Sequence, residues 1–147
     1  FVDLMNQEAQ QLGATGSHFM NPNGLPDENH YTTVYDLYLI FQKALQDETF
    51  YQLISTSSYT TNYTAADDSA KTQDWSSTNQ YKTGESKLPD GFTLVGGKTG
   101  TTGDAGFCLV LLTDNAGGQP VISIVLKADC KSNLYLMMNE ILAGCGN

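Results

Sequence analysis

The chain has 147 residues, of which 40% are hydrophobic and 10% aromatic, enough to fill the core of one ordinary domain and too much for a disordered chain. Sixteen acidic residues stand against seven basic ones, and all seven are lysine. Because the chain has no arginine, which binds phosphate in a bidentate manner, and no basic patch, we expect no nucleic acid partner. No apolar run reaches the ~18 residues that cross a bilayer, and the first ten residues carry acids where a signal peptide needs bases.

The three cysteines, Cys108, Cys130 and Cys145, follow no C-x-x-C spacing, and the chain has only two histidines. We therefore expect no metal site and no cofactor. Cys108 lies within an apolar run and is predicted to be buried. Cys130 follows the last predicted strand and Cys145 lies at the end of the last predicted helix, and they are candidates for a disulfide if the fold brings them together.

In chain order, apolar residues at helical spacing predict a first helix over residues 1–12, ended by Gly13. No N-cap residue precedes Phe1, so we expect the chain to be a fragment. Residues 16–31 are rich in Gly, Pro and Asn and predict an ordered loop. Thr33, with Asp36 three residues later, predicts the capped start of a second helix within residues 32–45.

Residues 55–91 are polar, and we predict one strand at residues 57–64 and otherwise loop. Three β-type runs follow at residues 92–97, 105–113 and 120–128, the last two joined by a segment that suits a hairpin turn. They predict an antiparallel meander in one α+β unit. A last helix, residues 132–146, is predicted to cover the sheet with one apolar face: Leu134, Met137, Met138, Ile141 and Leu142.

Lys98 stands among glycines and hydroxyl residues in the segment 95–106. A phosphate-binding P-loop would need glycine where Phe92 stands and a helix afterwards, so we exclude it. Lys98-Thr99-Gly100 instead has the form of the K-T-G motif of serine penicillin-recognising enzymes. There the ammonium attracts a carboxylate, the hydroxyl binds it and the glycine lets the substrate lie close. A second triplet, Lys82-Thr83-Gly84, lies in polar sequence without flanking strands, so we interpret it as accidental.

Three segments, Met5–Gly13, His18–Leu25 and Gly96–Gly106, together resemble the D-alanyl-D-alanine carboxypeptidases among the low-molecular-weight penicillin-binding proteins. The resemblance implies part of a penicillin-binding protein/β-lactamase-like transpeptidase fold, in which the first two strands of a five-stranded antiparallel sheet come from an N-terminal segment that we expect this chain to lack. It implies a serine that forms an acyl-enzyme with peptidoglycan stem peptides ending in D-Ala-D-Ala. It also implies inhibition by β-lactams and an extracytoplasmic location in the cell envelope.

By the same resemblance, Lys98 is the lysine of the third motif, Thr99 binds the terminal carboxylate, and the backbone N–H of Thr101 forms half of the oxyanion hole. Lys131 stands near the place of an arginine that helps to hold the carboxylate in the family. We interpret His18 as a loop-packing residue and not as a base. Two further residues are predicted to bind substrate: Gly100 and Thr102.

Parts of the family pattern are missing. No serine in the chain has lysine three residues later, so neither the nucleophile nor its activating lysine is present. Ser77-Thr78-Asn79 has the S-x-N form but lies shortly before Lys98, and we interpret it as an asparagine-containing loop. We therefore expect residues 1–147 to be the C-terminal part of one catalytic domain, inactive alone. The run Pro120–Ala128, deprived of a neighbouring strand, is expected to promote self-association.

Two other interpretations remain open. The chain could come from a non-catalytic relative that binds muropeptides, or from an enzyme related to class A β-lactamases. The segment His18–Leu25 argues against the second of these. A carboxypeptidase would have the motifs S-x-x-K and S-x-N before Phe1 in the intact gene product, and a non-catalytic muropeptide-binding relative would lack them.

Overall fold

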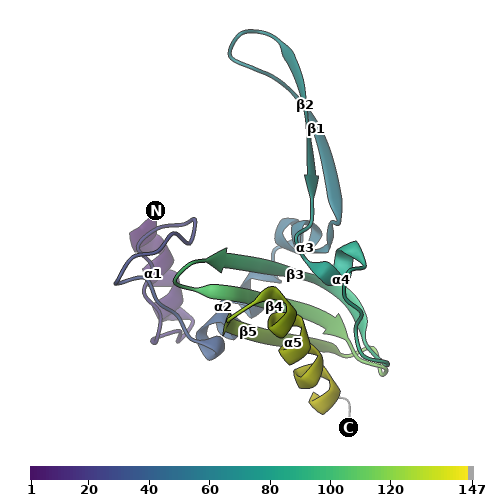
Figure 1. Cartoon of the computed structure of the whole chain (residues 1–147). Coiled ribbons are helices and arrows are strands. Elements are labelled where there is room, and N and C mark those ends of the chain that lie inside the picture. The colour runs from purple at the N-terminus through teal and green to yellow at the C-terminus, as the bar shows by residue number, and fades with distance from the viewer. Residues whose placement is uncertain (146–147) are drawn as a thin grey trace.

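The computed structural model describes residues 1–145 and has the predicted α+β composition, with helices packed on an antiparallel sheet (Figure 1). In chain order the elements are α1 (Val2–Gln11), α2 (Val34–Ala44), α3 (Glu48–Ser55), β1 (Ser58–Thr64), β2 (Ala70–Ser76), α4 (Gln80–Thr83), β3 (Thr93–Thr102), β4 (Gly106–Asp114), β5 (Pro120–Ala128) and α5 (Lys131–Cys145).

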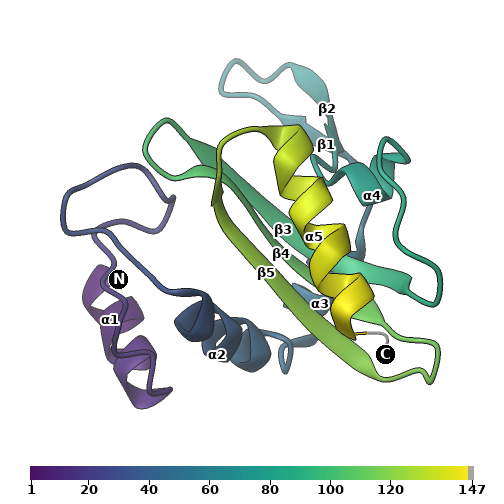
Figure 2. The ribbon, with the colours of Figure 1, turned by 60° about the horizontal axis from the view of Figure 1, so that its bottom comes forward.

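Strands β3, β4 and β5 form the predicted antiparallel meander, in the order β3-β4-β5. Its two faces carry separate cores because side chains alternate along each strand. On one face Leu109 and Leu111 pack with residues of α5, and on the other Leu112 packs with Phe41 of α2 and Ile54 of α3. Figure 2 shows α5 lying across one face of the sheet, and α2 packs against the opposite face.

The predicted helix boundaries follow from local chemistry. Gly13 adopts a φ of 81° directly after α1, as expected for a glycine that ends a helix. The Thr33 hydroxyl accepts a hydrogen bond from the Asp36 amide at 3.1 Å and caps α2. Both predictions are confirmed.

The predicted buried face of α5 is wrong in part. Met137 and Ile141 are 42% and 39% exposed, and the last predicted residue of this helix, residue 146, lies outside the described residues. Leu134, Met138 and Leu142, each four residues after the one before, form the buried face of α5. Tyr135 is also buried, and its hydroxyl accepts a hydrogen bond from the Gln80 amide at 2.8 Å. The residues that α5 buries are Leu134, Tyr135, Met138 and Leu142.

Three elements were not predicted: α3, α4 and β2. The strand predicted at residues 57–64 is confirmed as β1, but it pairs with β2 in a two-stranded hairpin that projects from the rest of the chain (Figure 1). All residues of β2 are exposed, so its sequence lacks the alternation of apolar and polar residues by which a half-buried strand is predicted. Lys82 lies in α4 and not in a loop, and β3 continues past residue 97 to Thr102.

The cysteine predictions are also corrected. Cys130 directly precedes α5 and Cys145 is its last residue, so the rise of the helix separates them by roughly 20 Å. A disulfide between them is excluded by this distance, and both are exposed free thiols. Cys108 is only half-buried. None of the helices within residues 1–145 has the length and apolar composition that crossing a bilayer requires.

Candidate active site

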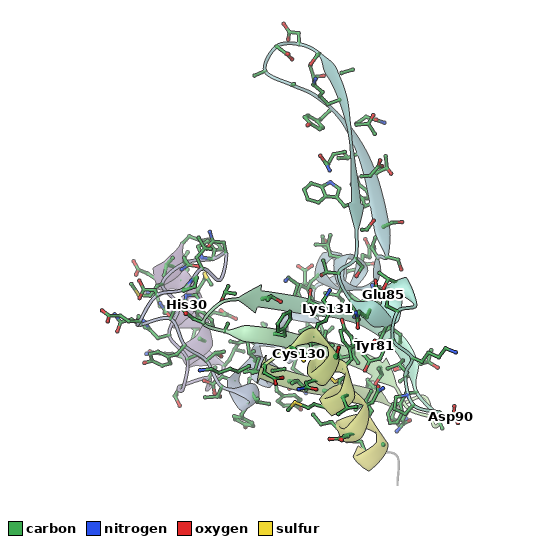
Figure 3. The ribbon with its side chains drawn as sticks, viewed as in Figure 1. His30, Tyr81, Glu85, Asp90, Cys130 and Lys131 are labelled. Carbon is green, nitrogen blue, oxygen red and sulfur yellow. The ribbon has the colours of Figure 1, made fainter. Side chains whose placement is uncertain are left out.

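Strand β3 places the five predicted site residues, Lys98 to Thr102, in succession along one wall of a cavity of 930 Å³. Lys131, which lies at the start of α5 (Figure 3), is also among the lining residues of this cavity. The opposite wall includes the loop Asn21–Gly24 and His30. Residues that lie far apart in the sequence therefore converge on the strand that carries the K-T-G triplet.

The charge of this cavity is opposite to that of the chain. Among the described residues, its lining includes two of the seven lysines, Lys98 and Lys131, and none of the sixteen acids. In a chain of net charge −9, two ammonium groups in a lining that contains no carboxylate form a local region that favours an anion. Hydroxyl groups of Thr99 and Thr101 lie on the same wall and can donate to it.

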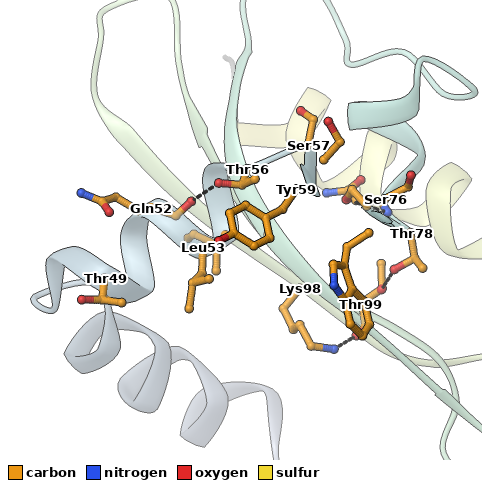
Figure 4. Close-up of a pocket in the computed structure, with 16 residues that line it drawn as sticks. Thr49, Gln52, Leu53, Thr56, Ser57, Tyr59, Ser76, Thr78, Lys98 and Thr99 are labelled. Carbon is orange, nitrogen blue, oxygen red and sulfur yellow. Dashed lines mark hydrogen bonds between the residues drawn. The ribbon is translucent and has the colours of Figure 1, made fainter. Parts of the chain in front are cut away.

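A second cavity, of 610 Å³, shares three lining residues with the first: Thr78, Lys98 and Thr99. The hydroxyls of Thr78 and Thr99 are 2.5 Å apart and hydrogen-bonded, and the Lys98 ammonium donates to the Thr99 carbonyl (Figure 4). Lys98 is exposed to solvent at this junction. Both cavities thus open onto the same ammonium and the same pair of hydroxyls.

The glycine pair before the triplet lets two neighbouring elements approach β3. A Cβ at Gly96 would lie 2.6 Å from the Ile54 carbonyl oxygen at the end of α3. A Cβ at Gly97 would lie 2.6 Å from the Val110 carbonyl oxygen and 3.3 Å from the side-chain nitrogen, Nδ2, of Asn79. Gly100 has nothing within 4 Å of its ideal Cβ, so the glycine of the triplet faces open space. These glycines therefore serve two purposes, close packing and access.

Within residues 1–145, β3 is also an edge strand of its sheet. Alternate residues of an edge strand direct their N–H and C=O groups away from the neighbouring strand. An extended peptide can hydrogen-bond to such groups by adding a strand. Thr102 differs from the other site residues because its hydroxyl accepts a hydrogen bond from the Ala105 amide at 3.0 Å, in the turn before β4.

Comparison with known proteins agrees with this geometry. The family model described as D-alanyl-D-alanine carboxypeptidase matches residues 1–130. The chain belongs to the D-alanyl-D-alanine carboxypeptidase family. It is 32% identical over 129 residues to a D-alanyl-D-alanine carboxypeptidase of Streptomyces sp. (strain K15), and 30% identical over 147 residues to one of Bacillus subtilis (strain 168).

The chain spans less than half of these two carboxypeptidases: 87% of it aligns with 42% of the first, and 97% of it with 34% of the second. Among solved structures, that of the Streptomyces K15 DD-transpeptidase matches with a TM-score of 0.82 and 28% identity. This match covers 99% of the chain and 53% of the transpeptidase. The chain therefore has the fold of about half of a DD-transpeptidase, as the sequence resemblance implied.

The other two motifs of the resemblance build the loop that faces β3. The Asn6 side chain donates to the Phe19 carbonyl and accepts from the Phe19 amide, both at 2.8 Å. Asn21 does the same for Leu25, at 2.9 and 3.0 Å. His18 contacts the Asn29 carbonyl oxygen through Nδ1 at 2.7 Å, which confirms its loop-packing role. In this carboxypeptidase-family chain, the two motifs shape the cavity wall by holding the loop backbone.

The second triplet has a structural role. The Lys82 ammonium donates to the carbonyl oxygens of Ile54 and Thr56, at 2.5 and 3.0 Å, and so holds the C-terminal end of α3. Burial lowers the pKa of Lys82 because it disfavours the charged ammonium. Gly84 ends α4 with a φ of 82°. This triplet is engaged in packing and does not line either cavity.

Sequence reasoning missed how close Ser77-Thr78-Asn79 lies to the site. Thr78 contacts Thr99, and Asn79 is buried behind β3, where its side-chain oxygen accepts from the Tyr81 amide at 3.1 Å. The segment is a loop that caps α4, as interpreted, but it also lines the 610 Å³ cavity. The available signal was a run of small polar residues between two unassigned elements, which does not report a contact with β3.

Proposed function

We propose that this chain supplies the carboxylate-binding side of the active site of a serine-type D-alanyl-D-alanine carboxypeptidase. The observation that carries the proposal is the 930 Å³ cavity, in which Lys98 to Thr102 and Lys131 meet with no acidic residue among the described lining. A stem peptide ending in D-Ala-D-Ala has a terminal carboxylate, which matches the charge of this wall.

In the proposed complex, the stem peptide extends along the free edge of β3. Its terminal carboxylate meets the Thr99 hydroxyl, with Lys98 and Lys131 as the nearby cations. Thr78 fixes the Thr99 hydroxyl through their 2.5 Å hydrogen bond. The backbone N–H of Thr101 stabilises the oxyanion that forms when a serine attacks the scissile carbonyl. Gly100 leaves room for the peptide, and Thr102 holds the turn that ends the strand.

The nucleophile is proposed to come from outside these 147 residues, because no serine within them has lysine three residues later. Formation of the acyl-serine would release D-alanine, and hydrolysis of the acyl-serine would then release the shortened peptide and regenerate the serine. The chain by itself is then inactive. β-Lactams, which carry a carboxylate and an acylating carbonyl, would occupy the same wall, and the whole protein would act on peptidoglycan outside the cytoplasmic membrane.

Covalent labelling tests this proposal. The gene product that carries this chain is expected to release D-alanine from a peptide ending in D-Ala-D-Ala and to retain a fluorescent penicillin. Peptide mapping should place the penicilloyl group on a serine outside residues 1–147, and the 147-residue chain should retain no label. A gene product that binds the peptide but neither releases D-alanine nor retains the label would indicate a non-catalytic muropeptide-binding relative. A penicilloyl group on any serine of this chain would refute the site assignment.

A further inference from the structure

One face of the β1–β2 hairpin carries none of the side-chain hydrogen bonds that join its two strands. Strand register places Tyr59 opposite Trp75, Thr61 opposite Gln73 and Tyr63 opposite Lys71. Directly opposed residues of an antiparallel pair share a face, and every second residue along a strand returns to it. We call this set the aromatic face: Tyr59, Thr61, Tyr63, Lys71, Gln73 and Trp75.

The three rings of the aromatic face are largely open to solvent. Tyr59 is 62% exposed, Tyr63 50% and Trp75 59%. The hairpin projects beyond α3, where no other element of the described chain covers it (Figure 1). Large aromatic side chains gathered on one exposed surface mark an interaction site more often than a structural one.

The opposite face of the hairpin is different, because its polar side chains bond to one another. The Thr60 hydroxyl donates to the Asp74 carboxylate at 2.6 Å, and the Thr72 hydroxyl donates to the Asn62 side-chain oxygen at 2.8 Å. These cross-strand bonds stabilise the ribbon from one side. The aromatic face therefore remains available for a ligand without loss of the contacts that hold the hairpin.

The aromatic face is continuous with the candidate active site. Tyr59 and Trp75, at the base of the hairpin, line the 610 Å³ cavity together with Lys98 and Thr99. Figure 4 shows Tyr59 on the wall of this cavity, near Lys98. Tyr63 lies four residues farther along β1, or about 13 Å toward the hairpin tip. A ligand on this face would thus extend outward from whatever occupies the site at Lys98.

We propose that the aromatic face binds the uncharged glycan strand of peptidoglycan, next to the stem peptide whose end lies at Lys98. This inference rests on the function proposed above. A pyranose ring has an apolar C–H face, which packs on an aromatic ring, and a rim of hydroxyl and N-acetyl groups. The hydroxyl of Thr61 and the amide of Gln73 stand between the rings, where they can hydrogen-bond to that rim.

Charge favours a neutral sugar over the other extended ligands. Residues 58–76 contain three aspartates and one lysine, a net charge of −2, in a chain of net charge −9. An acidic polymer or an anionic lipid surface would be repelled. The aromatic face itself carries no acid, and its one cation, Lys71, lies at the end far from the cavity. A chain of N-acetylated amino sugars is neutral, so the negative charge of the hairpin does not repel it.

The chain provides its own probe for this binding, because Trp75 is its single tryptophan. Titration with chitotetraose, a peptide-free N-acetylglucosamine tetrasaccharide, is expected to change the fluorescence of Trp75 in a saturable way. Tyr63→Ala should weaken this binding about fivefold, since a stacked aromatic ring is worth on the order of 1 kcal/mol. Tyr35→Ala is the matched control: Tyr35 is 65% exposed on α2, and its loss should leave the affinity unchanged.

The alternatives have distinct outcomes. Absence of a saturable response, or equal losses from Tyr63→Ala and Tyr35→Ala, would overturn the proposal. Trp75 responding to a D-Ala-D-Ala peptide or to anionic phospholipid vesicles, but not to chitotetraose, would overturn it in favour of a peptide or membrane surface. Lys98→Ala should leave chitotetraose binding intact. Sugar binding without penicillin acylation of the gene product would refute the proposed catalytic function alone, and acylation without sugar binding would refute this inference alone.

Discussion

Gly96 shows how the candidate site depends on the absence of a single side chain. Its ideal Cβ position is 2.6 Å from the Ile54 carbonyl oxygen, a backbone atom that cannot rotate away. Gly96→Ala should therefore push α3 off β3 and lower the free energy of unfolding by about 1–3 kcal/mol, the usual cost of overpacking. Gly100→Ala is the control, because its Cβ would meet nothing within 4 Å. Urea denaturation measures both; equal stabilities would contradict the packing explanation.

Tyr81 gives a pH-dependent prediction. Burial, and secondarily the neighbouring Tyr135, raise the pKa of Tyr81 from 10.0 to about 12. The unfolded chain therefore loses this proton at lower pH than the folded chain. The stability that the protonated Tyr81 phenol gives to the folded chain is complete below about pH 10 and is lost as the pH rises toward 12. Its hydroxyl donates to the Asn139 side-chain oxygen at 2.7 Å.

Tyr81→Phe should lower the free energy of unfolding by ~1 kcal/mol at pH 8, because Asn139 loses its donor. The deficit relative to the unmodified chain should shrink between pH 10 and 12. Denaturation curves at pH 8 and pH 11 check both parts. A deficit that stays constant over this range would show that the Tyr81 phenol does not titrate as described.

At this scale, the sequence predicted residues whose chemistry is local. Lys98 was preferred to Lys82 because apolar β-type runs flank it, and the structure places Lys98 at the cavities and Lys82 against the end of α3. The role of Thr78 could not be predicted. Its contact with Thr99 depends on the path of the chain through α4, which a polar segment without periodicity does not specify.

Among the elements, those with long apolar runs were predicted, and most of those that are short or fully exposed were missed. Strands β4 and β5 have long apolar runs, and the Thr33 cap marks α2. The strand β2 forms only because β1 pairs with it, and both of its faces meet solvent. The helix α3 is capped by Asp47, which accepts from the Phe50 amide at 2.9 Å, but it has only eight residues and follows α2 closely.

The helix α5 fixes the state of two cysteines. Because Cys130 and Cys145 lie at its two ends, roughly 20 Å apart, the monomer should have no internal disulfide. Alkylation under denaturing conditions should modify all three thiols without reductant, as followed by mass spectrometry. A reductant-dependent gain of two alkyl groups on the monomer would contradict the position of α5.

For the whole molecule, the free edge of β5 leads to a prediction about association. Within residues 1–145, β5 is the outer strand of the sheet beyond β4, and most of its side chains are apolar. Such an edge recruits a strand of another chain, and exposed Phe1, before α1, and exposed Leu4, within it, add apolar surface. We propose that the 147-residue chain forms dimers or larger assemblies through Pro120–Ala128.

Sedimentation velocity tests this association. Leu126 is half-exposed on β5, so Leu126→Lys puts a charge on this strand and should shift the chain toward monomer. Leu136→Lys is the matched control on α5, where Leu136 is 60% exposed and is not part of the strand. A monomeric unmodified chain would refute the edge argument, and equal effects of the two variants would assign the association to general hydrophobicity.

The rate at which a penicillin acylates the gene product that carries this chain tests the role of Lys98 most directly. Lys98 is the cation that both cavities share, and removal of a group that stabilises charge at the reacting centre costs on the order of a hundredfold. Lys98→Ala should slow acylation by at least about this factor, whereas Lys43→Ala, on the exposed surface of α2, should leave the rate unchanged. An unchanged rate in Lys98→Ala would contradict the assignment of β3 as the active-site strand.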